Sequence, residues 1–478
     1  MPPGVSAVLW TPSTVPPGLP PRGLPEALGK YHATSSRLPD TFTARCAIRG
    51  VRRAIRTFIC SDRGRRRRLG ACQVPMMLLE RFLNSNHRTN NIEEADYYFV
   101  PLLDMCMHGR SGDRAKFLAE GIQYIRKHWK YWDLYPERHL LTAPGDHGAC
   151  TYQKDAVLSR AAWLVHWGLR GKEYGIACTQ GDGPACYVPG KDVVLPAFLA
   201  HESRISPDVV ARSPLMRAHE PGYVPPPRTH LLYLAGSLSK PVVGSDQATR
   251  DCPYAQGVRQ QLWQRFNETE GFFLVDGRQS YDEYLQSLAS SIFCFAPAGH
   301  GWGQRMTLAV MYGCIPVIMQ DNVTVAFEED LPFSEFALRV PNGDLDQLDG
   351  ILTSLTPGEI KAKQQGLACV WRRFAWSSVM GAHMGEDASE DAFATLLLIL
   401  GKRLKHSTSV LRTSCGAGGG VLGETGIDEA APAISADRIA IRWWLDRNHK
   451  DAPAKICQAP CFPGLENPAY REECQSKG

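Results

Sequence analysis

Three glycines and an arginine within "FCFAPAGHGWGQRMTLAVMYGCIPVIMQD" (293–321) have the spacing of an anion-binding loop. Gly299, Gly301 and Gly303 alternate with other residues, so the backbone can come close to a ligand there. Arg305 follows and supplies a planar guanidinium suited to phosphate. The alternative is a glycine-rich turn without a ligand, because the segment matches neither the Walker pattern nor G-x-G-x-x-G. Of the two, the residue types favour binding of a phosphate or diphosphate.

The residues around the loop predict a strand, a helix and a second strand. Apolar runs at 292–296 and 315–319 indicate buried strands. Residues 304–312 are apolar nearly all round, which indicates a buried helix that begins at Gln304. The loop would then lie at the carboxyl edge of a parallel sheet, where open α/β folds bind ligands. The N–H groups and dipole of the helix start also favour an anion there.

The rest of the chain predicts two α/β units. Downstream of residue 229, strand patterns alternate with helix patterns, which indicates βαβ units and a parallel sheet with helices on both faces. Upstream, residues 95–103 are aromatic and β-branched, as is typical of a buried strand. Residues 118–132 repeat apolar side chains at three- and four-residue intervals, which indicates one face of a long helix.

The length of the chain also favours two domains. A chain of 478 residues exceeds one ordinary hydrophobic core. Proline-rich sequence just before residue 230 is the candidate linker. We expect a poorly defined leader at 1–75, an N-terminal domain at 76–222, a linker at 223–229, a C-terminal domain at 230–400, and a disordered Gly/Ser-rich segment with a Cys-containing tail at 401–478.

Charge and cysteine content narrow the function classes. A net charge of +4 gives no strong case for a nucleic-acid partner, and the basic run at 63–68 is more simply a solvated segment. The 15 cysteines include no Cys-x-x-Cys pair, so neither a zinc ribbon nor a redox motif is indicated. Sequons at Asn267 and Asn322 would accept glycans in the secretory pathway. No apolar stretch reaches the ~18 residues of a membrane span, and residues 393–400 indicate the core face of a helix.

Several segments together resemble the exostosin-like glycosyltransferases, glycosyltransferase family 47, in their plant and green-algal form. The resemblance covers about 80–375 and implies a GT-B fold, with two Rossmann-like domains whose parallel sheets face a central cleft. The N-terminal domain would face the acceptor and the C-terminal domain would hold a nucleotide-sugar. The segments are "NSNHRTNNIEEADYYFVPL" (84–102), "KDVVLP" (191–196), "YDEYLQSLASSIFCFAPAG" (281–299), "GQRMTLAVMYGCIPVIMQD" (303–321) and "FEEDLPFSEFALRVP" (327–341).

The resemblance implies a sugar transfer that inverts the anomeric centre, with the donor diphosphate at the glycine loop. Arg305 would neutralise the charge that develops on the leaving group. Many relatives carry an acidic residue three positions after this arginine, where this chain has Leu308. Another carboxylate would then steady the sugar or ribose, and Glu328 or Glu329 is the candidate. The expected donor-binding residues are Gly299, Gly301, Gly303, Gln304, Arg305, Asp321, Glu328 and Glu329.

The resemblance also implies that neither a metal nor another cofactor is needed. GT-B enzymes of this kind generally rely on a helix dipole and a basic side chain instead. The sequence "DLD" (344–346) superficially matches the Asp-x-Asp metal signature of the other glycosyltransferase fold. It opens an expected helix just after a strand, so we interpret it as an N-cap.

An inverting transfer needs a general base on the N-terminal side of the cleft. Asp146 and His147 in "GDHG" (145–148) end an expected strand in that domain, and they are the candidate catalytic residues. A hydrogen bond of His147 within its own loop is an equally good interpretation. Asp192 is the lesser candidate, and Arg88 is expected to hold its loop rather than to touch substrate.

Two functions remain open at this stage. The first is a glycosyltransferase that acts on a polysaccharide or glycoprotein, and the second is a catalytically silent GT-B subunit that binds glycans. A nucleotide-sugar, a glycan or glycoprotein acceptor and a second glycosyltransferase are the expected partners. The resemblance implies the Golgi membrane or lumen. Residues 1–25 lack the pattern of a signal peptide, so we expect the targeting segment of a lumenal protein to be missing from this chain.

Overall fold

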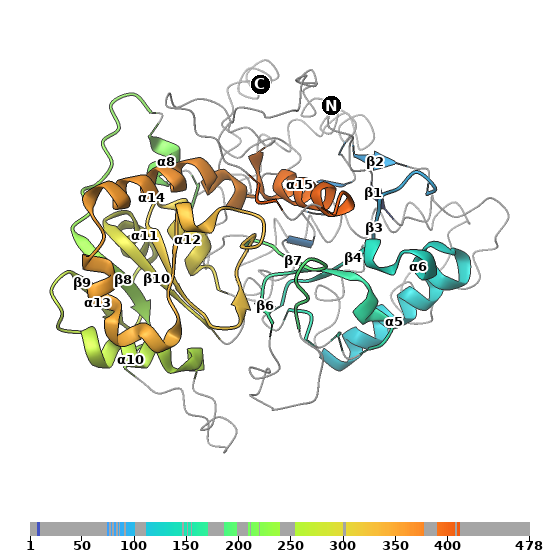
Figure 1. The fold of residues 1–478 in the computed structure, drawn as a ribbon, viewed down its shortest axis with the longest axis horizontal. Helices are drawn as coiled ribbons and strands as arrows, with labels where there is room; N and C mark the ends of the chain where they lie inside the picture. Colours follow the sequence, from blue (N-terminus) through green and yellow to red (C-terminus); the bar gives the residue numbers. More distant parts are fainter. Residues whose placement is uncertain are drawn as a thin grey trace, which may run out of the picture.

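The fold has two parallel sheets with helices packed around them (Figure 1). It was obtained as a computed structural model, and the statements below concern only the residues that it describes. These are 7–9, parts of 74–100, 111–170 without 146, 147, 151 and 154, 186–197, 209–239 without 211 and 219, 254–299, 303–376, and 390–411 without 407 and 408.

The N-terminal half is built on a six-stranded sheet in the order β2-β1-β3-β4-β5-β7, and all of its strand pairs are parallel. Strands β3, β4 and β5 are buried along their whole length, as expected for a sheet with both faces covered. The strands are β1 (Ala7–Leu9), β2 (Arg88–Thr89), β3 (Tyr97–Phe99), β4 (His139–Ala143), β5 (Ala162–Val165) and β7 (Val193–Val194).

The long helix expected in this half is present as α5 (Ser111–His128), which ends at His128 rather than continuing to residue 132. Its Leu118, Ile122 and Ile125 are buried, so the predicted apolar face does pack against the core. Short helical turns follow it along the chain: α6 (Tyr131–Leu134), η3 (Pro136–Arg138) and η4 (Leu158–Arg160).

The C-terminal half is built on a five-stranded parallel sheet in the order β13-β11-β10-β8-β9. The strands predicted on either side of the glycine loop are confirmed as β10 and β11, and β11 is completely buried. The strands are β8 (His230–Gly236), β9 (Phe272–Asp276), β10 (Ser291–Pro297), β11 (Ile315–Met319) and β13 (Leu338–Arg339).

Helices pack on this sheet, and two of them begin with a capping box, in which the cap residue and the third helical residue exchange hydrogen bonds. Ser280 and Glu283 form one box, and Thr356 and Glu359 form the other. The helices are α8 (Pro214–Arg217), α10 (Val258–Phe266), α11 (Tyr281–Ala289), α12 (Arg305–Met311), α13 (Leu348–Thr353), α14 (Pro357–Val370) and α15 (Ala392–Leu404), with 3-10 turns η5 (Tyr254–Gly257), η6 (Phe333–Glu335), η7 (Asn342–Gln347) and η8 (Trp371–Phe374).

Two elements join the halves. Strands β6 (Gly168–Leu169) and β12 (Val323–Thr324) pair antiparallel between them. Helix α15 lies between the halves in Figure 1, and its Leu400 carbonyl accepts a hydrogen bond from the Tyr97 hydroxyl at 3.2 Å. The predicted α/β class with two parallel sheets is confirmed, and the arrangement is that of a GT-B fold.

The structure departs from the sequence-based expectations in two places. Ala7–Leu9 pairs between β2 and β3, although residues 1–75 showed no strand pattern that we could recognise. The interpretation of "DLD" as an N-cap was wrong: the 3-10 turn η7 begins at Asn342, its cap residue is Pro341, and Asp346 pairs instead with Arg265. A carboxylate can pair with a guanidinium that is close in space but far away along the chain. Sequence spacing does not reveal such a partner.

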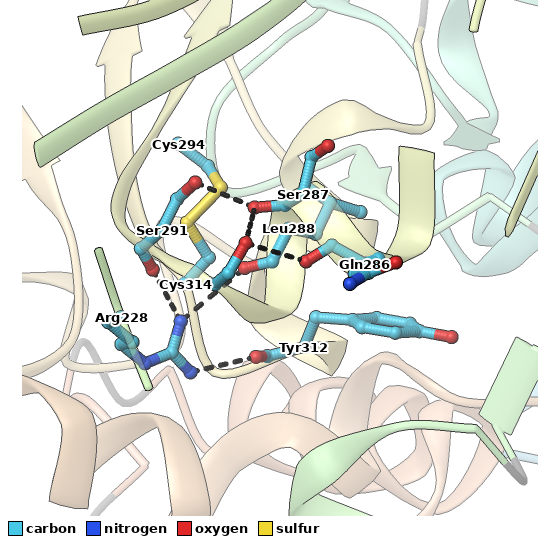
Figure 2. Close-up of a disulfide and its surroundings, with 9 residues drawn as sticks. Arg228, Gln286, Ser287, Leu288, Ser291, Cys294, Tyr312 and Cys314 are labelled. Atoms are coloured by element: carbon cyan, nitrogen blue, oxygen red, sulfur yellow. Dashed lines mark hydrogen bonds between the residues drawn. A yellow bond between two sulfur atoms is a disulfide. The ribbon is translucent and has the colours of Figure 1, made fainter. Parts of the chain in front are cut away.

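Two disulfides lie within the described residues. Cys150 pairs with Cys186 in the N-terminal half. Cys294, in the middle of β10, pairs with Cys314, which directly precedes β11 (Figure 2). The second disulfide therefore closes a ring of chain that contains the glycine loop and α12.

Candidate donor-binding site

A cavity of about 390 Å³ lies where the two halves meet. Its N-terminal wall comes from the residues that follow β5 and β7, and its C-terminal wall comes from α10, the glycine loop, α12 and the segment around β12. The residues that line it are His166, Trp167, Leu195, Ala197, Arg259, Ala296, Pro297, Gly299, Gly303, Gln304, Arg305, Met306, Thr307, Gln320, Val323, Thr324, Val325 and Ala326.

Two arginines make the C-terminal wall cationic. Arg305 is the first residue of α12, and its Nη2 donates to the Ala235 carbonyl at the end of β8. Its buried Nε has no hydrogen-bond partner among the described residues. Arg259 of α10 is 7% exposed and donates from Nη2 to the Ala298 carbonyl at 3.4 Å. No Asp or Glu belongs to the described lining, so this wall suits an anionic ligand.

The glycine loop lies against the cavity as predicted from its position after β10. Gly299 and Gly303 line it, whereas Gly301 is outside the described residues. A Cβ added at Gly303 would meet no atom within 4 Å, so there is open space beside this backbone. Gln304 also lines the cavity and is the cap residue of α12. That helix has only seven residues.

Gly236 explains how Arg305 is held. It has φ of +151°, and a Cβ at this position would lie 2.6 Å from Arg305 Nη2. Only glycine adopts this backbone and leaves room for the guanidinium. The end of β8 therefore sets the position of the cation.

The structure does not bring the three predicted carboxylates to the cavity. The carboxylate of Asp321 accepts from the Asn342 N–H at 3.2 Å through both of its oxygens. Glu328 accepts from the Val325 N–H at 2.8 Å and forms an ion pair with Arg339. Both carboxylates thus organise loops at the carboxyl edge of the C-terminal sheet.

Glu329 has a different structural role, because it bridges the two halves. Its carboxylate pairs with Arg170 at 3.3 Å and accepts from the Gly190 N–H at 3.2 Å. Leu308, where the resemblance led us to expect an acidic residue, is 5% exposed and belongs to the hydrophobic core. No described carboxylate therefore occupies the place that the resemblance implies for one.

Of the candidate bases, the structure describes only Asp192. Asp146, His147 and the side chain of Arg88 lie outside the described residues. Asp192 is completely buried, accepts from the Trp163 N–H at 3.0 Å and the Val188 N–H at 2.8 Å, and does not line the cavity. Burial raises the pKa of its carboxyl group, against the effect of neighbouring Lys191. Its contacts are those of a residue that organises a turn.

His166 and Trp167 were not identified from the sequence, yet both line the cavity. They directly follow β5, which ends at Val165. The only available signal was the apolar run "AAWLV" followed by a histidine, since parallel strands present the residues after them at the ligand-binding edge.

Two parallel-sheet halves with a cavity between them, one wall of which carries two arginines, are the arrangement of a GT-B type protein. The Exostosin GT47 domain model matches residues 39–355, and the chain therefore belongs to the exostosin family of glycosyltransferases, GT47. The predicted family is confirmed, and the match begins inside the segment that we expected to be a leader.

Three named relatives come from rice and Arabidopsis thaliana. The chain is 28% identical over 354 residues to rice "Probable glucuronosyltransferase GUT1", covering 70% of this chain and 75% of the relative. It is 30% identical over 346 residues to rice "Probable glucuronosyltransferase Os01g0926600" (70% and 76%) and 28% identical over 352 residues to Arabidopsis thaliana "Probable beta-1,4-xylosyltransferase IRX10" (70% and 76%). A Listeria monocytogenes structure described as a UDP-N-acetylglucosamine 2-epimerase shares 12% identity and covers 62% of this chain and 87% of that one. Its TM-score of 0.25 is too low to bear on the fold.

Proposed function

We propose that this protein transfers a sugar from a nucleotide-sugar to a hydroxyl of a polysaccharide or glycoprotein, with inversion at the anomeric carbon. The observation that carries the proposal is the cavity between the halves, whose C-terminal wall presents Arg259 and Arg305 and whose described lining has no carboxylate. The donor diphosphate lies against these arginines and the backbone of Gly299 and Gly303. The plant relatives named for glucuronosyl and xylosyl transfer support a sugar of this kind and a cell-wall polysaccharide acceptor.

The arginines contribute most when the bond to the leaving group breaks. Negative charge then builds up on the β-phosphate oxygen, and a preorganised guanidinium stabilises it more strongly than water would. Arg305 is preorganised by Ala235 and Gly236, so little reorganisation is needed during the reaction. We propose that this charge stabilisation makes a divalent metal unnecessary.

We infer that the protein works in an oxidising compartment, the Golgi lumen. Two disulfides among the described residues support this location, because such bonds are rare in reducing compartments. None of the described helices is both long and apolar enough to cross a membrane.

Binding of nucleoside diphosphates by calorimetry tests the site. Arg305→Ala is expected to weaken binding by about 1.5 to 3 kcal/mol, the range for a charge-assisted contact. Arg265→Ala is the matched control, because Arg265 lies on α10 but pairs with Asp346 rather than lining the cavity. Equal affinity of folded Arg305→Ala and wild type would refute the site.

Transfer from a panel of nucleotide-sugars, assayed with and without EDTA, tests the activity and its independence of metal. Activity that is lost in EDTA and restored by manganese would refute the proposal that no divalent metal is needed.

A further inference from the structure

The two sequons of the chain lie in different structural surroundings. Asn267 begins the first sequon, which forms the turn between α10, ending at Phe266, and β9, starting at Phe272. Asn322 begins the second, which runs from the turn after β11 into β12. Both match the acceptor pattern for N-linked glycans equally well, so their surroundings have to distinguish them.

The first sequon is accessible in the folded protein. Asn267 and Glu268 are exposed, and Thr269 is half-buried. The Asn267 N–H donates to the Trp263 carbonyl at 3.2 Å, whereas its side-chain amide has no hydrogen-bond partner among the described residues. A free asparagine amide in a surface turn is the form in which a bulky, hydrophilic glycan can be accommodated.

The second sequon is part of the strand pair that joins the halves. Asn322 itself is exposed, but Val323 is 3% exposed and Thr324 is 1% exposed. The Thr324 hydroxyl accepts from Nε of Arg170, and the Asn322 carbonyl accepts from the Arg170 N–H at 2.8 Å. Once β12 has paired with β6, this threonine is out of reach of a modifying enzyme.

A glycan on Asn267 would also leave the cavity free. Helix α10 begins beside the cavity, where Arg259 belongs to the lining. Asn267 follows Arg259 by eight residues, which corresponds to about 12 Å along a helix axis. The turn then leads into the start of β9, and parallel strands start at the edge of the sheet opposite the ligand-binding edge. The modification is therefore compatible with an open donor site.

We propose that Asn267, rather than Asn322, carries an N-linked glycan. The inference rests on the lumenal location proposed above and adds a covalent modification to it. The co-reactant is an oligosaccharide attached to a polyprenyl diphosphate. The side-chain nitrogen of Asn267 forms a bond to the anomeric carbon of the first sugar, and the bond from that carbon to the diphosphate oxygen breaks. The electron pair leaves with the lipid diphosphate, the amide gives up one proton to the solvent through the modifying enzyme, and no group is oxidised or reduced.

Mass spectrometry of the native protein, purified from its own cells, tests the assignment. A peptide-N-glycosidase releases the glycan and converts its asparagine to aspartate, which takes up heavy oxygen when the reaction is run in enriched water. We expect the label on the peptide that contains residue 267 and none on the peptide that contains residue 322. A sample without the glycosidase controls for spontaneous deamidation. Label on both peptides, or on residue 322 alone, would overturn the assignment.

Two variants of the full chain, expressed in a eukaryotic secretory pathway, give a second measurement. Asn267→Gln should lose the whole mass of the glycan and migrate faster than wild type on a denaturing gel. Asn322→Gln is the matched control and should migrate with wild type. Migration of Asn267→Gln with untreated wild type would contradict the proposal. If either variant does not fold, the labelling of the native protein still decides the matter.

The same digests separate a wrong assignment from a wrong location. Peptides joined by the Cys150–Cys186 disulfide together with an unlabelled residue 267 would overturn the glycan but leave the oxidising location standing. Reduced cysteines together with two unlabelled sequons would refute the lumenal location and the glycan with it. Neither result depends on sugar transfer by this protein, so the proposed activity is decided separately by the transfer assay.

Discussion

Removing the Cys294–Cys314 disulfide should destabilise the C-terminal half by a predictable amount. The two cysteines are 20 residues apart, and closing a chain loop of this length in the unfolded state is worth about 3 kcal/mol in the chain-entropy model. Both side chains are buried, Cys294 at 3% and Cys314 at 0% exposure. Alanine is therefore the right replacement, since serine would bury an additional hydroxyl.

The same change should weaken donor binding. The ring closed by this disulfide contains Gly299, Gly303 and Arg305, so its loss gives the donor loop more conformations to lose on binding. The double variant Cys294→Ala/Cys314→Ala should therefore have a lower free energy of unfolding and a higher Kd for nucleoside diphosphate.

Urea unfolding followed by tryptophan fluorescence, together with calorimetry, measures both effects. Cys150→Ala/Cys186→Ala is the control, because these cysteines do not line the cavity. They lie 36 residues apart in the N-terminal half, so the loss of their disulfide should cost about 4 kcal/mol of unfolding free energy in the same model. We expect both double variants to lose stability, but only Cys294→Ala/Cys314→Ala to lose donor affinity. An unchanged unfolding midpoint and an unchanged Kd in that variant would refute the reasoning.

Two further predictions concern buried charge. The guanidinium of Arg228 donates to the backbone carbonyls of Leu288, Ser291 and Tyr312 beside the disulfide (Figure 2), so Arg228→Met should cost about 3 kcal/mol of unfolding free energy; a urea midpoint equal to that of wild type would contradict this. Burial lowers the pKa of His139 to about 4, so the unfolded chain, with a histidine pKa near 6.5, binds the proton first as the pH falls. Lowering the pH from 7 to 5 should therefore cost about 2 kcal/mol for this histidine. His139→Phe should show a smaller loss in thermal melts at the two pH values, and an equal loss would count against this assignment.

Local patterns in the sequence were enough to place the glycine loop and Arg305 at the edge of the C-terminal sheet, but they did not identify Arg259. The apolar runs on either side of the glycine loop gave β10 and β11, and the position of Arg305 after the loop placed its guanidinium at the edge of the sheet. These features depend on neighbours along the chain, which periodicity and glycine spacing report directly.

The N-terminal wall of the cavity depends on contacts that sequence patterns do not report. His166 becomes a cavity residue because β5 pairs with β7 and Leu195 fixes its ring. Glu329 was expected near the donor from its neighbours in the chain, but its partner Arg170 is 159 residues away. Pairings over such distances follow from the three-dimensional packing of the sheets.

Helix α15 has a consequence for the order in which the chain can fold. It comes from the far end of the described chain, yet its Arg403 donates to the Lys191 and Asp192 carbonyls, and Asp391 at its start pairs with Arg81, 310 residues earlier. During synthesis the N-terminal half therefore emerges without one of its packing partners and completes its core only after the C-terminal half has been made. Contacts across such separations form late, because the cost of closing the loop comes before the gain from the contact. Until α15 arrives, the newly made N-terminal half exposes apolar surface that a chaperone would have to protect.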